Sequence, residues 1–361
     1  MSDAPSNLED LRPLIFWEGF PPCGLMTKHV ADMFGDRLVL VGTRPAVPFQ
    51  GLEDVLGHRI VWLEKPDDIW ERREEFADRN FVVHTGWSHQ GWLKFDRWIK
   101  KRGAKVVSTV DNQFKGNLRQ WMGALWFRLW LRRHFDATLV PGRSATTLMK
   151  FLGMPAERIF TGYYGAYEGI YFPGLSITER PKEFLFVGQL IPRKGVDLLL
   201  EAFRQYRQRG GNWNLRILGS GPLKDQCQGD GIVFEGFGQA QTVSQRMRET
   251  RCLVLPSRED HWPTVVCEAA ASGALLITST HVGSSEDLVR SGINGAVFEQ
   301  MTAASLTEAL LNVSGWSDLL LENGQATSLG LARGYTSVSY LAAFVRIAER
   351  VGFGTSLPQG T

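Results

Sequence analysis

Short apolar runs alternate with amphipathic or turn-rich segments twice along this chain. The first set of β-branched runs predicts strands at residues 37–42, 59–63, 81–84 and 105–111. The second set predicts strands at residues 183–188, 215–219, 232–237, 252–257 and 274–278. Buried strands separated by helical patterns are typical of parallel βα units. We therefore expect an α/β protein with two Rossmann-like, doubly wound domains that face each other across a cleft.

A segment without periodicity separates the two sets of strands. Residues 173–182 contain prolines and a glycine but no regular apolar spacing, which predicts a linker. This places a first domain at 1–172 and a second domain at 183–334. Residues 335–352 are apolar at helical spacing, and we expect this last helix to pack back toward the first domain.

A polar loop leads from the strand at 252–257 into a predicted helix over 264–272. Pro263 suits the first position of this helix, and Gly273 suits the position just after its end. Thr264 and Glu268 are four residues apart, so they share one face of the helix. Asp260 lies in the loop, just ahead of the first free amides of the helix.

The start of this helix combines an anion site with two acids. Unpaired amides and the helix dipole favour an anion there. Ionised carboxylates accept strong hydrogen bonds, so Asp260 and Glu268 would suit the hydroxyl groups of a sugar. The alternative is structural: Asp260 caps the helix, and Glu268 is a solvated side chain. Spacing alone favours the structural alternative.

Residues 160–300 resemble the donor-binding region of retaining GT-B glycosyltransferases of family four. In that family a Glu, seven residues and a second Glu precede a small-residue helix, and Asp260 and Glu268 occupy these acidic positions. The segments that also match, in the family's order, are "YYGAYEGIYFP" (163–173), "FVGQLIPRKGVDLLLEAF" (186–203), "ILGSGPL" (217–223), a loop with Gly283, Ser284 and Glu286, and a turn with Gly292, Asn294 and Gly295. Over residues 1–150 the resemblance is loose.

The resemblance implies that a sugar moves from a nucleoside diphosphate, of UDP or GDP type, to an acceptor hydroxyl with its anomeric configuration kept. Cations stabilise the charge that gathers on the leaving diphosphate. The residues implied in catalysis are Asp260, His84 and Lys194, and those implied in donor binding are Gly24, Gly188, Arg193, Lys194, Gly219, Gly221, Asp260, Pro263, Thr264, Val265 and Glu268. Lys194 and Arg193 would face the diphosphate, Glu268 the ribose and Asp260 the transferred sugar. For Arg193 and Lys194 the alternative is a solvated turn.

Three candidates come from the first domain, which the resemblance makes the acceptor domain. His84 ends the strand at 81–84, where the family often carries a histidine near the reacting centre, although a lone histidine there is as well explained by a structural role. Asp111 ends the next strand and would contact the acceptor, or would cap a helix. Gly24 matches the glycine loop after the family's first strand.

Composition sets the broad class of the protein. The chain has 361 residues, enough for two domains, and a formal net charge of +2 that favours no polyanionic partner. Its four cysteines show no paired spacing, and we find no metal-binding motif, so we expect no metal or other cofactor. The N-terminus lacks the order of a signal peptide and there is no apolar run of about 18 residues, so we expect a cytoplasmic protein.

Positive charge is concentrated between residues 86 and 133. This segment carries eleven lysines and arginines against two acids, together with six tryptophans: Trp87, Trp92, Trp98, Trp121, Trp126 and Trp130. Cations interleaved with tryptophan suit an anionic membrane surface, which would bring the protein to a lipid-linked acceptor at the inner membrane face. Nucleic acid is a weaker use of the same pattern. The structural alternative is a core helix with arginines at its edges.

The sequence therefore predicts a metal-independent retaining glycosyltransferase of polysaccharide or glycolipid biosynthesis. A nucleotide-sugar epimerase or hydrolase of the same fold is one alternative. A non-catalytic protein that binds a nucleotide sugar or glycan is another, because Gln189 replaces the family's arginine and Asp260 shortens its first acid. An oxidoreductase built on "GSG" at 219–221 is remote, because the remaining fingerprint glycine is missing.

Overall fold

The computed structural model describes residues 7–20, 22–45 and 50–354. The chain forms two compact units. Unit 1 consists of Met1–Tyr164 and Ser337–Thr361, and unit 2 consists of Gly165–Thr336. Residues 173–182 thus lie within unit 2, whereas most of the segment 335–352 lies within unit 1.

The described part of unit 1 is built on one seven-stranded sheet in the order β3-β2-β1-β4-β5-β6-β7, with every neighbouring pair parallel. The strands are β1 (Pro13–Trp17), β2 (Val39–Thr43), β3 (Ile60–Leu63), β4 (Phe81–Thr85), β5 (Lys105–Thr109), β6 (Ala137–Val140) and β7 (Ile159–Thr161). The four strands predicted in this half are confirmed as β2 to β5. The order reverses at β1, which pairs β2 on one side and β4 on the other.

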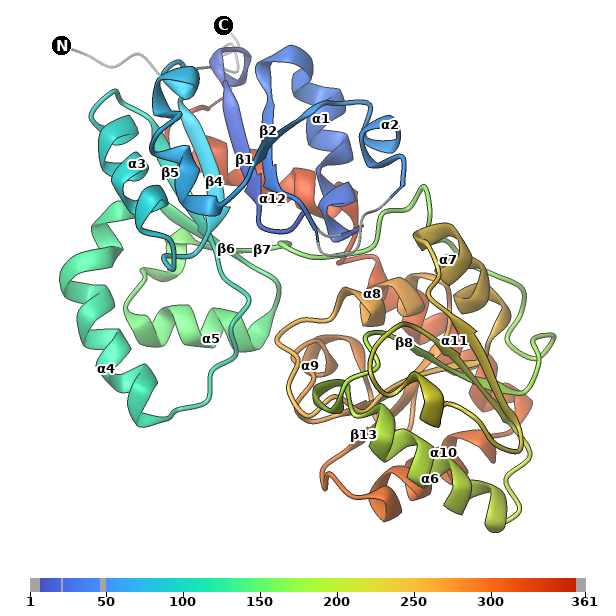
Figure 1. Cartoon of the computed structure of the whole chain (residues 1–361). Helices are drawn as coiled ribbons and strands as arrows, with labels where there is room; N and C mark the ends of the chain where they lie inside the picture. The colour runs from blue at the N-terminus through green and yellow to red at the C-terminus, as the bar shows by residue number, and fades with distance from the viewer. Residues whose placement is uncertain (1–6, 21, 46–49, 355–361) are drawn as a thin grey trace, which may run out of the picture. The chain divides into compact units, whose positions relative to one another are not determined.

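The helices of unit 1 bury one face each. They are α1 (Lys28–Phe34), α2 (Leu52–Leu56), α3 (Gln90–Lys100), α4 (Leu118–Trp126), α5 (Arg143–Leu152) and α12 (Ser337–Arg350). α12, the predicted last helix, buries Tyr340, Phe344 and Ile347 at helical spacing against α1, β7 and the 3-10 helix Pro22–Thr27. In Figure 1 it passes, in red, behind the strands of unit 1.

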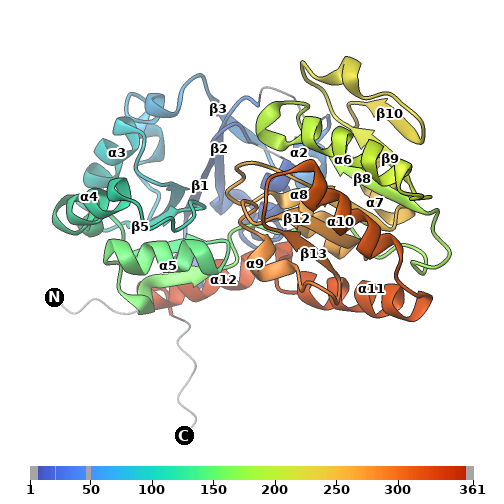
Figure 2. The same cartoon turned by 90° about the horizontal axis from the view of Figure 1, so that it is seen from below.

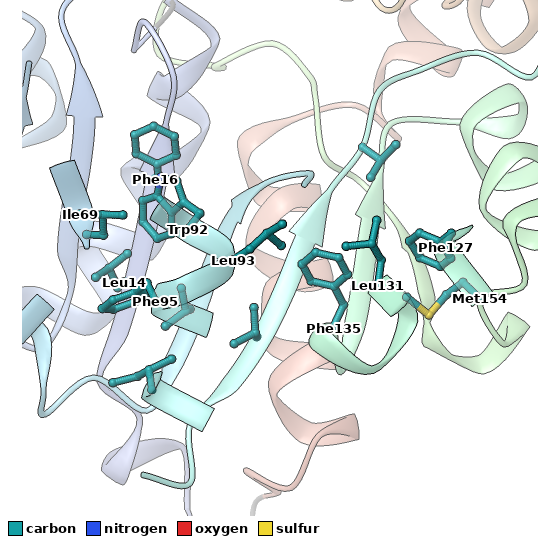
Figure 3. Packing of buried hydrophobic residues seen from close by; sticks show 14 of the residues in the cluster. Leu14, Phe16, Ile69, Trp92, Leu93, Phe95, Phe127, Leu131, Phe135 and Met154 are labelled. Carbon is teal, nitrogen blue, oxygen red and sulfur yellow. The ribbon is translucent and has the colours of Figure 1, made fainter. Parts of the chain in front are cut away.

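A large aromatic cluster forms the core on one face of the unit 1 sheet. Trp92 of α3 has no exposed surface, and its ring lies 4.7 Å from that of Phe16 in β1. A π-helical turn, Phe127–Leu131, continues α4. In Figure 3 the side chains of Phe127 and Leu131 extend into the cluster, together with Met154. One face of the segment 118–131 is therefore part of the core.

The described part of unit 2 contains a six-stranded parallel sheet in the order β10-β9-β8-β11-β12-β13. The strands are β8 (Glu183–Val187), β9 (Asn214–Leu218), β10 (Ile232–Gly236), β11 (Cys252–Leu255), β12 (Leu275–Ser279) and β13 (Gly295–Phe298). The five strands predicted in this half are confirmed as β8 to β12. The order reverses between β8 and β11, and in open α/β sheets ligands bind at the carboxyl ends of the strands at such a point.

The helices of unit 2 form two packed groups. They are α6 (Val196–Gln208), α7 (Ala240–Glu249), α8 (Thr264–Ala271), α9 (Ser285–Leu288), α10 (Ala303–Ser314) and α11 (Asp318–Ala332). α6 packs with α10, as Figures 1 and 2 show, whereas α8 packs with α7, α9 and α11. Right-handed crossovers that run in opposite directions from β8 and β11 place these groups on opposite faces of the sheet.

One buried arginine ties residues 173–182 to the rest of unit 2. The guanidinium of Arg180 donates to the carbonyl oxygens of Leu175, Met247, Thr250 and Ser272 at 2.8 to 3.3 Å, and the residue is 2% exposed. Burial lowers the pKa of Arg180 to about 10, so the side chain stays cationic at neutral pH. The segment expected to be a linker is thus packed and hydrogen-bonded along unit 2.

Across residues 7–20, 22–45 and 50–354, every helix is too short or too polar to cross a bilayer.

Candidate functional site

The carboxyl ends of β8 and β11 bring Lys194 and Asp260 together. Lys194 ends the loop after β8, in the 3-10 turn Pro192–Lys194, and Asp260 lies in the loop after β11. Nζ of Lys194 is 2.5 Å from Oδ2 of Asp260, although the residues are 66 positions apart. Their side chains are only 15% and 11% exposed. The alternative of a solvated turn is therefore wrong for Lys194.

Asp260 is fixed by its backbone as well as its side chain. Its amide donates to the carbonyl oxygen of His281 at 3.1 Å, and its carbonyl accepts from the amide of Gly283 at 2.9 Å. The Ser257 hydroxyl adds a 3.3 Å hydrogen bond to Oδ2. The loop after β11 and the loop after β12 thus hold this carboxylate between them, because both contribute backbone bonds to the same residue.

The predicted helix after this loop is confirmed as α8, Thr264–Ala271. Pro263 occupies the N-cap and not the first helical position that we expected. The amides of Thr264 and Val265 follow directly, at the end of the helix where N–H groups have no intrahelical acceptor. Both residues are partly exposed, so their amides lie where a ligand can reach this helix end.

Glu268 is a buried carboxyl and not the solvated side chain of the structural alternative. It is 7% exposed, and burial raises its pKa to about 7. Hydrogen bonds from the side chains of Thr264 and Tyr171 act in the opposite direction, because they stabilise the ionised form. The carboxyl therefore titrates near neutral pH and is held by two hydroxyl donors.

Arg193 is exposed, unlike its neighbour Lys194. Its guanidinium donates to the carbonyl oxygen of Glu259 at 2.8 Å, and its own carbonyl accepts from the amide of Arg258 at 2.8 Å. These bonds join the loop after β8 to the loop after β11. Arg193 thus places a cation on the same pair of loops as Lys194 and Asp260.

Two of the predicted donor-binding glycines, Gly219 and Gly221, are explained by backbone packing. A Cβ on Gly219 would lie 1.9 Å from the carbonyl oxygen of Gly188, and one on Gly221 would lie 2.6 Å from that of Leu190. The amide of Leu190 donates to the Ser220 carbonyl at 2.8 Å. The loops after β8 and β9 therefore approach so closely that side chains are excluded at Gly219 and Gly221.

The remaining predicted residues lie in unit 1. Gly24 lies beneath the ring of Phe20, because a Cβ there would come within 2.5 Å of that ring. His84 has no exposed surface. Its Nε2 atom is 3.0 Å from Oδ1 of the equally buried Asp96, and its ring stacks on Trp92 with centroids 4.8 Å apart. This environment is that of a structural histidine, and the catalytic role of His84 stays a prediction.

Asp111 lines a cavity of about 500 Å³ at the carboxyl ends of β1, β4 and β5, where the order of the unit 1 sheet reverses. The hydroxyl of Tyr164 donates to Oδ2 of Asp111 at 3.3 Å. Tyr163 stacks between Tyr164, 4.1 Å away between ring centroids, and Trp17, 5.5 Å away. An aromatic wall with a few polar groups is typical of a small-ligand pocket.

Two polar atoms of this cavity's lining residues are buried without a partner among the described residues. They are Nε1 of Trp17 and Oγ1 of Thr85. Buried polar atoms are almost always hydrogen-bonded, so these two atoms are exceptions among the residues around the cavity.

Sequence reasoning missed Tyr171, Ser257 and the aromatic wall of the unit 1 cavity. Tyr171 lies inside the segment 163–173 that matched the family pattern, and this position was its only signal. Trp17 ends β1, which was not among the predicted strands, and the only signal for it was the resemblance of the loop with Gly24 to one that follows the family's first strand. No cluster of three metal-ligating side chains occurs within the described residues.

A known family model matches the part of the chain that contains Lys194, Asp260 and Glu268. Residues 170–315 match the family model "Glycosyl transferases group 1". An uncharacterized glycosyltransferase of Methanocaldococcus jannaschii is 30% identical over 40% of this chain and 42% of its own length. The putative colanic acid biosynthesis glycosyltransferase WcaL of Salmonella typhimurium is 27% identical over 46% of this chain and 44% of its own. The chain thus spans less than half the length of these relatives.

Similarity in three dimensions extends over both units. A crystal structure of Anabaena HepE in complex with UDP and glucose aligns with a TM-score of 0.71 at 14% identity, covering 93% of this chain and 99% of that one. At this identity the likeness concerns the fold alone. It confirms the predicted GT-B fold class with two Rossmann-like domains.

Proposed function

We propose, because residues 170–315 belong to the glycosyl transferases group 1 family, that this protein is a retaining glycosyltransferase. It moves a sugar from a nucleoside diphosphate sugar to a hydroxyl of a glycan or lipid-linked acceptor. The observation that carries the proposal is the Lys194–Asp260 pair beside the N-terminus of α8, at the point where the unit 2 sheet reverses. The relatives named for polysaccharide synthesis support the same class of reaction.

The loops after β8 and β11 would hold the nucleotide sugar. The amides of Thr264 and Val265 and the cations Lys194 and Arg193 suit its diphosphate, since amides and ammonium groups both donate to anionic oxygens. Glu268, in the second turn of α8, would accept hydrogen bonds from the ribose. HepE, whose structures contain UDP or UDP-glucose, supports a UDP-type donor for this chain as well.

In the reaction the bond between the anomeric carbon and the β-phosphate oxygen breaks, and a bond to the acceptor oxygen forms on the same face of the sugar. The acceptor proton passes to the departing diphosphate, so no separate base is required. Lys194 stabilises the growing negative charge, and its ion pair with Asp260 keeps the ammonium group in place before the donor arrives. Asp260 has a second carboxylate oxygen that would bind a hydroxyl of the transferred sugar.

The unit 1 cavity would hold the acceptor. Asp111 offers a carboxylate for an acceptor hydroxyl, and the partly exposed rings of Trp87 and Tyr164, which line the same cavity, offer apolar surface for a sugar ring. We place the reaction in the cytoplasm, where residues 86–133 would bring the protein to the inner face of a membrane that carries a lipid-linked acceptor.

Nucleotide binding and turnover test this function. UDP and UDP-sugars should raise the melting temperature, because a ligand of the folded state stabilises it. Glu268→Ala should weaken UDP binding by about tenfold, the value of a hydrogen bond to a charged group. Lys194→Ala should slow transfer from a radiolabelled UDP-sugar by about a hundredfold, the loss expected for one transition-state donor.

Arg204→Ala is the matched control, since Arg204 is an exposed cation of unit 2 paired only at the surface with Glu201. It should leave binding and transfer unchanged. Full activity in both Glu268→Ala and Lys194→Ala would disprove the site. Label released as free sugar or as an epimer, with none transferred, would disprove the transferase and indicate a hydrolase or epimerase.

A further inference from the structure

A continuous apolar stripe covers the outer side of the helical segment 118–131. Its members recur at helical spacing, and each is between 48% and 75% exposed: Leu118, Trp121, Met122, Leu125, Trp126, Leu129 and Trp130. Single exposed apolar residues are ordinary, but a contiguous set of this size marks an interaction surface.

The same segment buries its other side, so its exposure does not come from loose packing. Phe127 is 1% exposed and Leu131 is 3% exposed, and both extend into the unit 1 core (Figure 3). α4 also packs on α5, where the ring of Trp121 meets that of Phe151 edge-on at 4.7 Å between centroids. The structural alternative of a core helix with arginines at its edges accounts for one face of the segment only, because the segment is apolar on two faces and only one of them is covered.

A groove of about 880 Å³ continues this stripe along α3. Trp126 and Trp130 belong to the stripe and also line the groove. Five cations line it, and no acid does: Lys94, Arg97, Lys100, Lys101 and Arg133. Within the described residues, no ion pair joins Lys94, Arg97 or Lys101 to an acid. Lys100 does have one, with Asp136 at 2.8 Å.

The positive charge of these cations affects the pKa of a neighbouring side chain. The pKa of His134, which also lines the groove, is lowered first by burial. The charges of Arg97, Lys100 and Arg133 lower it further, against the opposite effect of Asp96. The groove is thus a positively charged, tryptophan-lined site.

We propose that this groove binds the phosphate groups of anionic lipids while the stripe 118–130 enters the interfacial layer of the same bilayer. Cations beside a broad apolar face match an anionic membrane, and tryptophan rings prefer the headgroup level. From residue 112 to residue 135 the sequence has no acid that would be repelled by such a surface. The inference rests on the proposed function, because it names the surface that brings the enzyme to a lipid-linked acceptor.

The proposal also narrows the segment expected to meet a membrane. Trp92 has no exposed surface, so it cannot insert. Trp87 and Trp98 are partly buried against the unit 1 core, and of these two only Trp98 lines the groove. The contact is thus formed by the three tryptophans of the stripe and by the groove.

Sedimentation of the full chain with vesicles tests the two parts separately. Vesicles of phosphatidylcholine alone are compared with vesicles of equal parts phosphatidylcholine and phosphatidylglycerol. The groove variant Arg97→Gln/Lys101→Gln should lose about thirtyfold in binding to the anionic vesicles, since each cation near such a surface strengthens binding about fivefold. The stripe variant Leu125→Ser/Leu129→Ser should lose about tenfold or more on both kinds of vesicle.

The control variant Lys182→Gln/Leu319→Ser changes one exposed cation and one exposed leucine of unit 2, and should bind like the wild type. Groove and stripe variants that also bind like the wild type would overturn the proposal. So would a wild type that binds a single-stranded oligonucleotide but neither kind of vesicle. The melting-temperature rise with UDP is measured for every variant: if it persists while vesicle binding fails, only the membrane proposal is lost.

Discussion

Glu268 shows how one residue can combine a cost in stability with a role in binding. Burying an ionised carboxylate to this degree lowers the stability of the fold. Its presence in the second turn of α8 is consistent with a ligand that supplies further hydrogen-bond donors. The Thr264 and Tyr171 side chains offset only part of that cost, because the pKa remains raised to about 7. The residue is therefore sensitive to pH in the range where the protein would work.

Glu268→Gln should remove a pH dependence of stability. The pKa is raised in the folded state from 4.5 to about 7, so the native form holds the proton more tightly between these values. Stability from this group is full below pH 4.5 and is lost as pH rises through 7, by on the order of 3 kcal/mol at most. Urea unfolding at pH 5 and pH 8 should show a smaller loss of stability in the variant than in the wild type. Equal losses would contradict the prediction.

The role of a polar residue depends on the side chains that it contacts, and the sequence does not reveal these contacts. His84 ends one predicted strand and Asp260 follows another, and both were candidates for catalysis. The structure pairs His84 with Asp96 inside a core, whereas it pairs Asp260 with Lys194 at a strand's carboxyl end. Sequence reasoning found the Lys194–Asp260 site because family spacing marked each residue. It could not find Tyr171, which reaches Glu268 only through the fold.

At the scale of elements, the sequence predicted nine of the thirteen described strands and missed β1, β6, β7 and β13. Length alone does not explain these misses, because the predicted β3 and β11 have four residues, as β6 and β13 do. β1 begins at a proline and β13 at a glycine, residues that mark turns more often than strands, and β7 has only three residues. They form because neighbouring strands and helices cover them, as the full burial of β1 shows.

The segment 173–182 is a second case in which the sequence pattern did not predict the local structure, because its lack of periodicity predicted a linker. Its order comes from Arg180, whose guanidinium donates to three carbonyl oxygens at the ends of two other elements of unit 2. A single arginine in a proline-containing segment gives no sign of this. The contact depends on carbonyls at the ends of α7 and α8 that only the folded chain presents.

Arg180→Met should destabilise unit 2 by about 3 kcal/mol, since it leaves several buried carbonyl groups without a donor. Urea unfolding of the full chain, followed by tryptophan fluorescence, measures this change. Lys182→Met is the control: Lys182 is exposed two residues away, so the change should stay within about 0.5 kcal/mol of the wild type. A similar small effect at Arg180 would mean that the segment is held by other contacts.

At the scale of the whole molecule, the chain passes between the units twice. Unit 2 is one continuous stretch, Gly165–Thr336, whereas unit 1 needs the C-terminal helix α12 to complete it. Phe344 of α12 is 1% exposed, and its ring centroid lies 5.0 Å from that of Phe81 in β4. The proposed donor site is confined to unit 2. A substitution that weakens the packing of α12 should therefore lower the stability of unit 1 and leave nucleotide binding unchanged.

Phe344→Ala should lower the stability of unit 1 by about 3 to 5 kcal/mol, the usual cost of such a truncation in a core. In calorimetry the transition of unit 1 should shift to lower temperature. The transition temperature of unit 2 should stay unchanged without UDP and should still rise when UDP is added. At a UDP concentration a hundredfold above Kd, binding should add about 2.7 kcal/mol to the free energy of unfolding of unit 2. Val338→Ala on the same helix is the control, because Val338 is 56% exposed and should cost little. If Phe344→Ala abolished the UDP shift while unit 2 stayed folded, nucleotide binding would have to involve unit 1 directly, and a donor site confined to unit 2 would be wrong.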